Sequence, residues 1–338
     1  MADISAFNND VEEDIVKTIL TSLFAFIIVL AGIDTPVRGQ EYPNRPIKLV
    51  IPYPPGASTD ALGRMVAQKM TDSMGQSVVV ENRGGASGNI GSDMVAKAAA
   101  DGYTFLLGTD ATHGTNVFLF QKFPYDPAKD FTPLTLAVKN IIVLVVPPSL
   151  PVRSVGELIE YGKANPGKLS YGTSGAGSPH HLSGELLHQM TGVDLVHVPY
   201  KGGGPALTDL LGGQIPMLFA SLVSVEQYIR SGKMRALAIT DVARYKGLPD
   251  VPIVAETLPG FEMTSWLGFF GPAGLPQPVV TKLHEEIVKA LNKPDVRPKL
   301  EATGLEVVGN TPDQFAGIVR RTLETRGALV RSAGIKAE

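Results

Sequence analysis

The sequence IKLVIPYPPGASTD (residues 47–60) joins an apolar β-type run to a small, hydroxyl-rich loop and the start of a helix. The same order returns in LSYGTSGAGSPHH (residues 169–181). Each copy continues through an amphipathic helical stretch to a second β-type run, VVVENRGG (residues 78–85) in the first and LVHVPYKGG (residues 195–203) in the second. A strand, loop and helix unit that occurs twice predicts two α/β domains.

Both loops have the chemistry of an anion site, although neither contains Lys or Arg. A loop between the end of a strand and the start of a helix offers several backbone N–H groups and the positive end of a helix dipole. One such site in each half of the chain predicts an anionic ligand held between two domains.

The composition of the chain is that of an ordinary globular protein. It has 338 residues, of which 19% are charged and 44% hydrophobic, so disorder and fibre are excluded. A formal charge of -3, with no block of five Lys or Arg residues, argues against nucleic-acid binding. Because the chain has no cysteine, it cannot form disulfides, thiolate metal sites or a cysteine nucleophile.

An uncharged apolar run covers residues 19–33 near the amino terminus. It is shorter than the roughly 20 residues that a permanent membrane-spanning helix needs. We expect residues 1–39 to be a signal peptide, cleaved before Gln40. The preceding segment is acidic, whereas a signal peptide begins with basic residues, so we hypothesise a true start near Val16 that makes Lys17 the basic region. An uncleaved anchor is the alternative.

Beyond Gln40, short apolar runs alternate with helical segments, which is typical of an α/β protein with mostly parallel sheets. The expected strands are residues 47–53, 78–81, 103–108, 141–146, 169–173, 195–198, 215–220 and 235–240. The expected helices include residues 60–74, 178–190, 278–291 and 311–333. The run IIVLVV (residues 141–146) is apolar throughout, as a strand covered on both faces requires.

Two proline-rich segments indicate where the chain passes between domains. PPSLP (residues 147–151) follows a central strand, and a second segment occupies residues 248–259. We expect domain I to comprise residues 40–140 and 257–338, with domain II inserted as residues 141–256. Two consecutive domains are the alternative. An inserted domain would give two chain crossings and a hinge between the domains.

Five ordered motifs carry a family resemblance. They are YPNRPI (residues 42–47), PGASTD (55–60), VENRGGASGNIG (80–91), DGYT (101–104) and VPYKG (198–202). With these motifs, residues 40–338 resemble the substrate-binding proteins of tripartite tricarboxylate transporters, the Bug family of periplasmic receptors. The resemblance implies a two-lobed Venus-flytrap fold, with a mostly parallel sheet flanked by helices in each lobe. It also implies a monomeric periplasmic receptor that captures a small carboxylate and delivers it to membrane transporter subunits in a transient complex, with no catalysis, cofactor or metal.

The same resemblance implies that residues 55–60 and 174–178 pinch the carboxylate of the ligand between the lobes. We call these two segments the first and second pincer loops. The expected ligand-binding residues are Tyr53, Pro55, Gly56, Ala57, Ser58, Thr59, Asp60, Thr109, Asp110, Ala111, Ser174, Gly175, Ala176, Gly177, Ser178, His181, Phe219 and Ser221.

Several of these residues also have simpler interpretations. Ser58 and Thr59 could cap a helix, and Asp60 could stabilise the loop rather than meet an anion that it would repel. Thr109 to Ala111 could form a plain turn, and Phe219 could pack in the core. The family's first loop often reads Pro-Gly-Gly, so Ala57, in place of the second glycine, would be strained if that position needs a positive φ.

The alternative function is a serine hydrolase of the α/β type with Ser174 as nucleophile. The sequence GTSGA (residues 172–176) lacks the last glycine of Gly-x-Ser-x-Gly, and no Asp partner is marked for His188, His197 or His284. A dinucleotide loop is disfavoured because GAGSPH (residues 175–180) lacks the third glycine. No His-Glu-x-x-His motif indicates metal catalysis.

Overall fold

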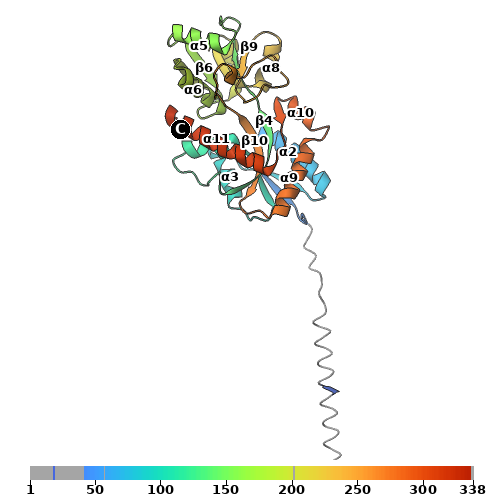
Figure 1. Cartoon of the computed structure of the whole chain (residues 1–338). Coiled ribbons are helices and arrows are strands. Elements are labelled where there is room, and N and C mark those ends of the chain that lie inside the picture. Colours follow the sequence, from blue (N-terminus) through green and yellow to red (C-terminus); the bar gives the residue numbers. More distant parts are fainter. Residues whose placement is uncertain (1–17, 20–41, 57, 201, 336–338) are drawn as a thin grey trace, which may run out of the picture. The chain divides into compact units, whose positions relative to one another are not determined.

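The computed structural model describes residues 18–19, 42–56, 58–200 and 202–335 (Figure 1). The expected cleavage site before Gln40, nearly all of the expected signal peptide, and Ala57 therefore lie outside the described residues. Contacts divide the chain into residues 1–42 and 43–338, and both sheets belong to the second unit. No helix in the described part of the chain is both long enough and apolar enough to cross a membrane.

The first sheet has six strands. Their order across the sheet is β11 (Leu305–Val307), β4 (Phe131–Asn140), β10 (Ser265–Pro272), β3 (Thr104–Thr109), β1 (Ile47–Ile51) and β2 (Val78–Asn82). Helices α2 (Ser58–Met74) and α9 (Gln277–Leu291) contact each other and this sheet. Helices α3 (Asn89–Ala96) and α11 (Pro312–Ala333) also contact it, and α11 packs against the single-turn helix Ala111–Thr115 that follows β3.

The second sheet has five strands. Their order is β7 (Leu195–Pro199), β6 (Leu169–Thr173), β8 (Met217–Ser221), β5 (Ile142–Val146) and β9 (Arg235–Ile239). The helices of this part are α5 (Val155–Ala164), α6 (Pro179–Thr191), α7 (Gly203–Leu211) and α8 (Leu222–Arg230). The remaining short helices are Ala86–Gly88, α4 (Asn116–Leu119), Val254–Glu256 and α10 (Arg297–Glu301). Every residue of β5 is buried, in agreement with its uniformly apolar sequence.

The expected α/β fold class is confirmed, and its sheets are mixed rather than purely parallel. β1 pairs in parallel with β2 and β3, and β6 pairs in parallel with β7 and β8. β10, however, lies antiparallel between β3 and β4, and β5 lies antiparallel between β8 and β9. Each of these central strands follows a passage of the chain from one sheet to the other, so it enters its new sheet from the shared edge. The strands β4, β10 and β11 were not anticipated from the sequence.

The two sheets are joined by closely bonded connections. β4 ends at Asn140 and β5 begins at Ile142, so a single residue separates them. The return passage runs from Ile239 to Ser265, where Met263 N donates to Thr240 O at 2.9 Å. Thr240 N also donates to Ile142 O at 3.0 Å, so a backbone hydrogen bond joins the return passage to the start of β5.

Helix α11 contributes to the cores of both sheets. Phe315 and Val319, near its start, belong to the apolar cluster that includes Trp266 and Phe270 of the first sheet. Leu329 and Val330, near its end, belong to the cluster built on the second sheet. One helix thus spans the boundary between the two halves, beside β4 and β10 (Figure 1).

We predict that Gly184→Ala destabilises the protein by about 1–3 kcal/mol, because it overpacks the contact between α6 and β6. A Cβ at Gly184 would lie 2.1 Å from Cε2 of Tyr171, whose side chain is fully buried. The matched control is Gly317→Ala in α11, where the nearest atom is Arg320 Nη2 at 3.9 Å. Helix propensity should make this variant up to about 1 kcal/mol more stable than wild type. Urea denaturation followed by circular dichroism measures both, and equal stability of Gly184→Ala and wild type would contradict the prediction.

Candidate functional site

Asp60, the last residue of the first pincer loop, lies in the first turn of α2 and stabilises the loop through hydrogen bonds. The Asp60 carboxylate accepts hydrogen bonds from Gly56 N at 3.0 Å, from Arg64 Nε at 3.0 and 3.1 Å, and from Asn82 Nδ2 at 2.9 Å. Asn82 Nδ2 also donates to Tyr53 O at 3.0 Å. The hydrogen bond from Arg64 is the largest cause that lowers the pKa of Asp60 to about 2. Asp60 therefore has the structural role that the sequence left as its alternative.

The end of β3 meets Tyr53, which lies between β1 and the first pincer loop, through a hydroxyl contact. Tyr53 Oη and Thr109 Oγ1 are 2.9 Å apart, and Thr109 N donates to Thr112 Oγ1 at 3.0 Å. Burial raises the pKa of Tyr53 to about 12, so its hydroxyl stays protonated. Gly88 packs against Thr112 and Tyr53, since a Cβ at Gly88 would lie 2.7 Å from Thr112 Cγ2 and 3.2 Å from Tyr53 Oη. Tyr53 and Thr109 are thus brought together, as neighbouring strand ends of one sheet.

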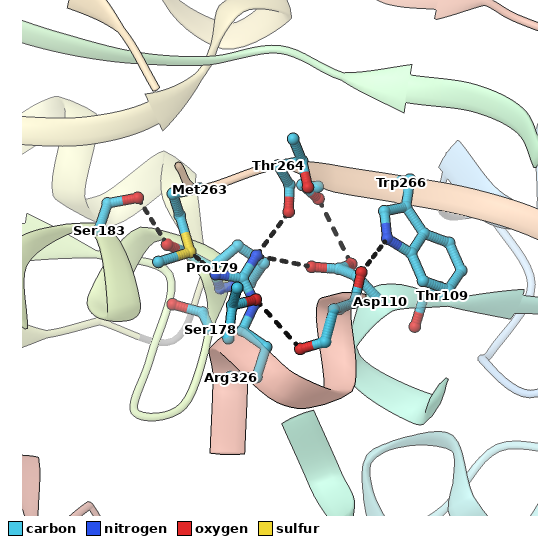
Figure 2. A network of polar contacts seen from close by, with 12 residues as sticks. Thr109, Asp110, Ser178, Pro179, Ser183, Met263, Thr264, Trp266 and Arg326 are labelled. Atoms are coloured by element: carbon cyan, nitrogen blue, oxygen red, sulfur yellow. Dashed lines mark hydrogen bonds and ion pairs between the residues drawn. The ribbon is translucent and has the colours of Figure 1, made fainter. Parts of the chain in front are cut away.

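Asp110 is buried and lies beside Arg326 of helix α11 (Figure 2). Its carboxylate lies 4.0 Å from Arg326 Nη2, and the Ser265 hydroxyl donates to it at 3.5 Å. Burial raises the pKa of Asp110 to about 6 despite the nearby guanidinium. Arg326 also donates to Thr264 O at 2.6 Å and contacts the Met263 sulfur. This buried pair holds α11 against the return passage of the chain, which the sequence did not reveal.

The second pincer loop is a turn that leads into α6. Ser178 N donates to Gly175 O at 3.3 Å, and Gly177 has a φ of +72°. Ser178 caps the helix, because its Oγ accepts from His181 N at 3.2 Å while donating to Gly175 O at 2.7 Å. Thr173 Oγ1 accepts from Gly175 N at 3.2 Å. Helix α6 therefore starts directly at the loop, with its positive dipole end beside it.

Two stacked histidines support this loop from beneath. The rings of His181 and His197 lie 3.7 Å apart and nearly parallel, and His181 Nδ1 accepts from Gly177 N at 3.0 Å. His181 Nε2 lies 3.5 Å from Glu185, whose carboxylate accepts from Tyr171 Oη at 2.6 Å. Burial, aided by His181, lowers the pKa of His197 to about 4. His181 thus helps to fix the shape of the loop by accepting a hydrogen bond from one of its backbone amides.

Ser221 and Phe219, both in β8, have different environments. Ser221 is partly exposed, and its Oγ accepts from Asn140 Nδ2 at 3.0 Å. Phe219 is 1% exposed and packs edge-on against Tyr171 in the core. Phe219 is therefore a core residue, the simpler of its two interpretations.

Two cavities lie where segments from both sheets meet, and no expected site residue lines either. The first, about 270 Å³, is lined by Leu136, Lys139, Val242, Glu262, Thr264, Trp266, Ile318, Arg321 and Thr322. The second, about 330 Å³, is lined by Tyr245, Lys246, Gly247, Arg297, Glu301, Glu306 and Val307. Among the described residues, no group of three or more His, Cys, Asp or Glu could hold a metal ion.

Residues 62–335 match the family described as the tripartite tricarboxylate transporter family receptor. This chain belongs to that family. It is a family of periplasmic receptors, and the expected two-lobed periplasmic-binding-protein fold is confirmed.

Curated relatives of this receptor extend over nearly its whole length. A Pseudomonas sp. (strain P51) protein described as a UPF0065 protein in the tcbD-tcbE intergenic region is 41% identical over 308 residues, which cover 90% of this chain and 91% of the relative. BugT of Bordetella pertussis is 38% identical over 321 residues, which cover 94% of this chain and 98% of BugT. The Bug-family resemblance is confirmed.

Solved structures of similar proteins carry bound ligands. R. palustris Rpa4515 with adipate has a TM-score of 0.73 and 38% identity, and the match covers 88% of this chain and 99% of that one. MatC from Rhodopseudomonas palustris with bound malate has a TM-score of 0.69 and 34% identity, and the match covers 86% of this chain and 100% of MatC.

The geometry also argues against the hydrolase alternative for this receptor. His188 Nδ1 lies against Val193 O, His197 Nε2 against Thr173 Oγ1 and His284 Nδ1 against Leu134 O. The histidine that contacts Ser174 is His180, at 2.7 Å, and its other nitrogen faces a serine hydroxyl rather than a carboxylate. The family and its structural neighbours are solute-binding receptors, so the expectation of a non-enzyme is confirmed.

We predict that Asp60→Asn lowers the unfolding free energy by about 1–3 kcal/mol, because three donors lose a charged acceptor. The folded pKa of about 2 lies below the ordinary value of 3.8, so the carboxylate stabilises the fold above pH 4 and this contribution is lost as the pH falls toward 2. The difference between wild type and variant should shrink over that range in denaturant titrations. Asp72→Asn, on the exposed face of the same helix, is the control, with an expected change within about 0.5 kcal/mol.

Proposed function

We propose that this receptor captures a small carboxylate between the two pincer loops in the periplasm and delivers it to a tripartite membrane transporter. The observation that carries the proposal is the pair of loops themselves. Each follows a parallel strand of its own sheet, each leads directly into a helix, and neither contains a basic residue.

Backbone amides and hydroxyls supply the donors for the carboxylate in this proposal. The first amides of α2 have no carbonyl partner within their own helix, so they are available to an anion. In α6, Pro179 has no N–H and His181 N donates to Ser178 Oγ, so His180 N is the first-turn amide left for the ligand. Ser174 and Thr59 add hydroxyl groups beside them, whereas the Ser178 hydroxyl already donates its proton to Gly175 O. Dipolar donors suit a carboxylate without fixing the rest of the ligand. The two R. palustris proteins illustrate this point, because the adipate of one and the malate of the other both carry two carboxylates but differ in length.

Capture in this proposal proceeds by closure of the two lobes, domain I (residues 40–140 and 257–338) and domain II (residues 141–256). The ligand bridges donors that belong to different sheets, so it binds better when the sheets approach each other. A ligand with higher affinity for the closed arrangement shifts the population toward closure. The passages at Asn140–Ile142 and Ile239–Ser265 would act as the hinge. The closed surface would then be recognised in a transient complex by the transporter subunits, with the receptor a monomer.

A panel of small acids tests the function. We predict that adipate, malate or a related mono-, di- or tricarboxylate raises the thermal midpoint of residues 40–338 by a few degrees at about 100 times its dissociation constant. Neutral amides of the same acids are the control ligands and should give no shift. Folded protein, free of co-purified ligand, that responds to no acid would contradict the proposal.

Ala176→Pro tests the second pincer loop directly. The Gly177 φ and the Ser178-to-Gly175 hydrogen bond fit a turn that accepts proline at its second position. Pro166 already occupies this position in a matching turn, where Lys168 N donates to Asn165 O at 3.2 Å and Gly167 has a φ of +73°. We predict that Ala176→Pro keeps the fold and weakens binding about tenfold, or about 1.4 kcal/mol, because it removes an amide from the loop. Pro166→Ala is the control, and equal affinity of Ala176→Pro and wild type would exclude that amide.

Export provides a separate test. We propose that residues 1–39 form a signal peptide, and we predict that the mature periplasmic protein begins at Gln40. Intact mass spectrometry of the periplasmic fraction measures this start. Gln40→Pro, which places proline just after the scissile bond, should leave the uncleaved precursor. A periplasmic or membrane-bound protein that retains residues 1–39 in wild type would contradict the cleavage.

A further inference from the structure

His180 lies between two serine hydroxyls at the second pincer loop. Its Nδ1 is 2.7 Å from Ser174 Oγ, in the loop, and its Nε2 is 3.4 Å from Ser221 Oγ, at the end of β8. The His180 side chain is buried, at 9% exposure, whereas Ser174 and Ser221 are both partly exposed. The two hydroxyls can therefore meet a ligand, and the histidine behind them cannot.

Asn140 extends this set of contacts to the first sheet. Asn140 is the last residue of β4, and its Nδ2 donates to Ser221 Oγ at 3.0 Å. A continuous chain of hydrogen bonds thus runs from Asn140 through Ser221 and His180 to Ser174. It follows the connection between the sheets and ends at the pincer loop.

Proton counting limits what this chain can do. Burial lowers the pKa of His180 to about 4, so near neutral pH the ring is neutral, with one N–H donor and one acceptor nitrogen. If Nε2 carries the proton, Nδ1 accepts the Ser174 proton, and Ser221 accepts from both His180 and Asn140. If Nδ1 carries the proton, Ser221 donates to Nε2 and the Ser174 proton is released. Only one of the two serines can therefore donate outward at a time.

We propose that His180 is a positioning residue that decides which serine donates, and that a bound carboxylate selects its Nδ1–H tautomer so that Ser174 donates to one carboxylate oxygen. This inference rests on the proposed function. A carboxylate can only accept hydrogen bonds, so it favours the arrangement that frees the Ser174 proton. A ligand group that donates, such as an amine, favours the opposite arrangement. The chemical class of the ligand at the loop thus sets the direction of the hydrogen bond between Ser221 and His180, while Asn140 Nδ2 donates to Ser221 in both arrangements.

Nitrogen NMR measures the tautomer directly. The chain has six histidines, so ¹⁵N-histidine labelling gives a small set of signals, and loss of one set in His180→Asn assigns His180. With adipate, or malate if adipate does not bind, we expect the Nδ1 signal of His180 to have the chemical shift of a protonated ring nitrogen. A bound state in which Nε2 carries the proton overturns the inference and leaves the receptor function intact. If no acid binds, both fail together.

Paired substitutions give a second readout that a purely structural role would not produce. The amide nitrogen of asparagine lies near the position of Nδ1, and that of glutamine lies near Nε2. His180→Asn can therefore donate to Ser174, and we expect it to bind the acid about tenfold more tightly than His180→Gln. In Ser174→Ala the released donor is absent, so affinity falls about tenfold and the His180 tautomer no longer responds to the acid. Equal affinities of His180→Asn and His180→Gln, with both folded by circular dichroism, would overturn the inference.

Discussion

The arrangement of the two pincer loops depends on the one-residue connection between β4 and β5. Ile141 O accepts from Leu222 N at 2.8 Å, and Ile142 O accepts from Thr240 N at 3.0 Å, so the connection is bonded to the second sheet on both sides. A single residue cannot uncouple two strands that belong to different sheets. Any change in the distance between the loops must therefore occur by bending here and at the return passage, where Met263 bonds to Thr240. Helix α11 adds a third tie, because its two ends belong to different cores.

Each loop is held in shape by polar groups that do not face the ligand in the proposed mechanism. Asp60 accepts a hydrogen bond from Gly56 N in the first loop, and Asn82 donates one to Tyr53 O just before it. In the second loop, His181 accepts a hydrogen bond from Gly177 N. The buried side chains of Asp110 and Arg326 lie together beneath the surface. A free guanidinium beside the loops would bind any anion strongly, whereas neutral donors reward geometry, since each must be aligned to contribute. The placement of the charges is therefore consistent with a site that recognises a carboxylate by backbone and hydroxyl donors.

The sequence predicted the local elements better than the way the sheets are assembled. The expected strand 169–173 and the buried run 141–146 depend on side-chain patterns within a few residues, and the structure has β6 and β5 there. The antiparallel insertion of β10 depends on where a distant segment returns, and its glycine-containing sequence SWLGFFGP has no alternation that marks a strand. For the site, strand-end loops and caps were predictable, because Ser178 precedes Pro179 in a recognisable helix start. The roles of His180, Asn140 and Arg326 were not, since each depends on partners brought close only by the tertiary fold.

A delivery protein must bind and also release, and the distribution of donors between the sheets bears on both. In the proposed mechanism, each loop supplies only a few neutral donors, so either half alone would hold a carboxylate weakly, and the full set is present only when the halves approach. Opening then removes part of the binding free energy without breaking a buried ion pair, which would cost more. The hydroxyls of Ser174, in the second pincer loop, and Ser221, at the end of β8, share one histidine, so only one of the two can donate its proton outward at a time. In the proposed mechanism, release follows a bend at the two connections and a proton shift along the hydrogen bonds between Ser174, His180 and Ser221.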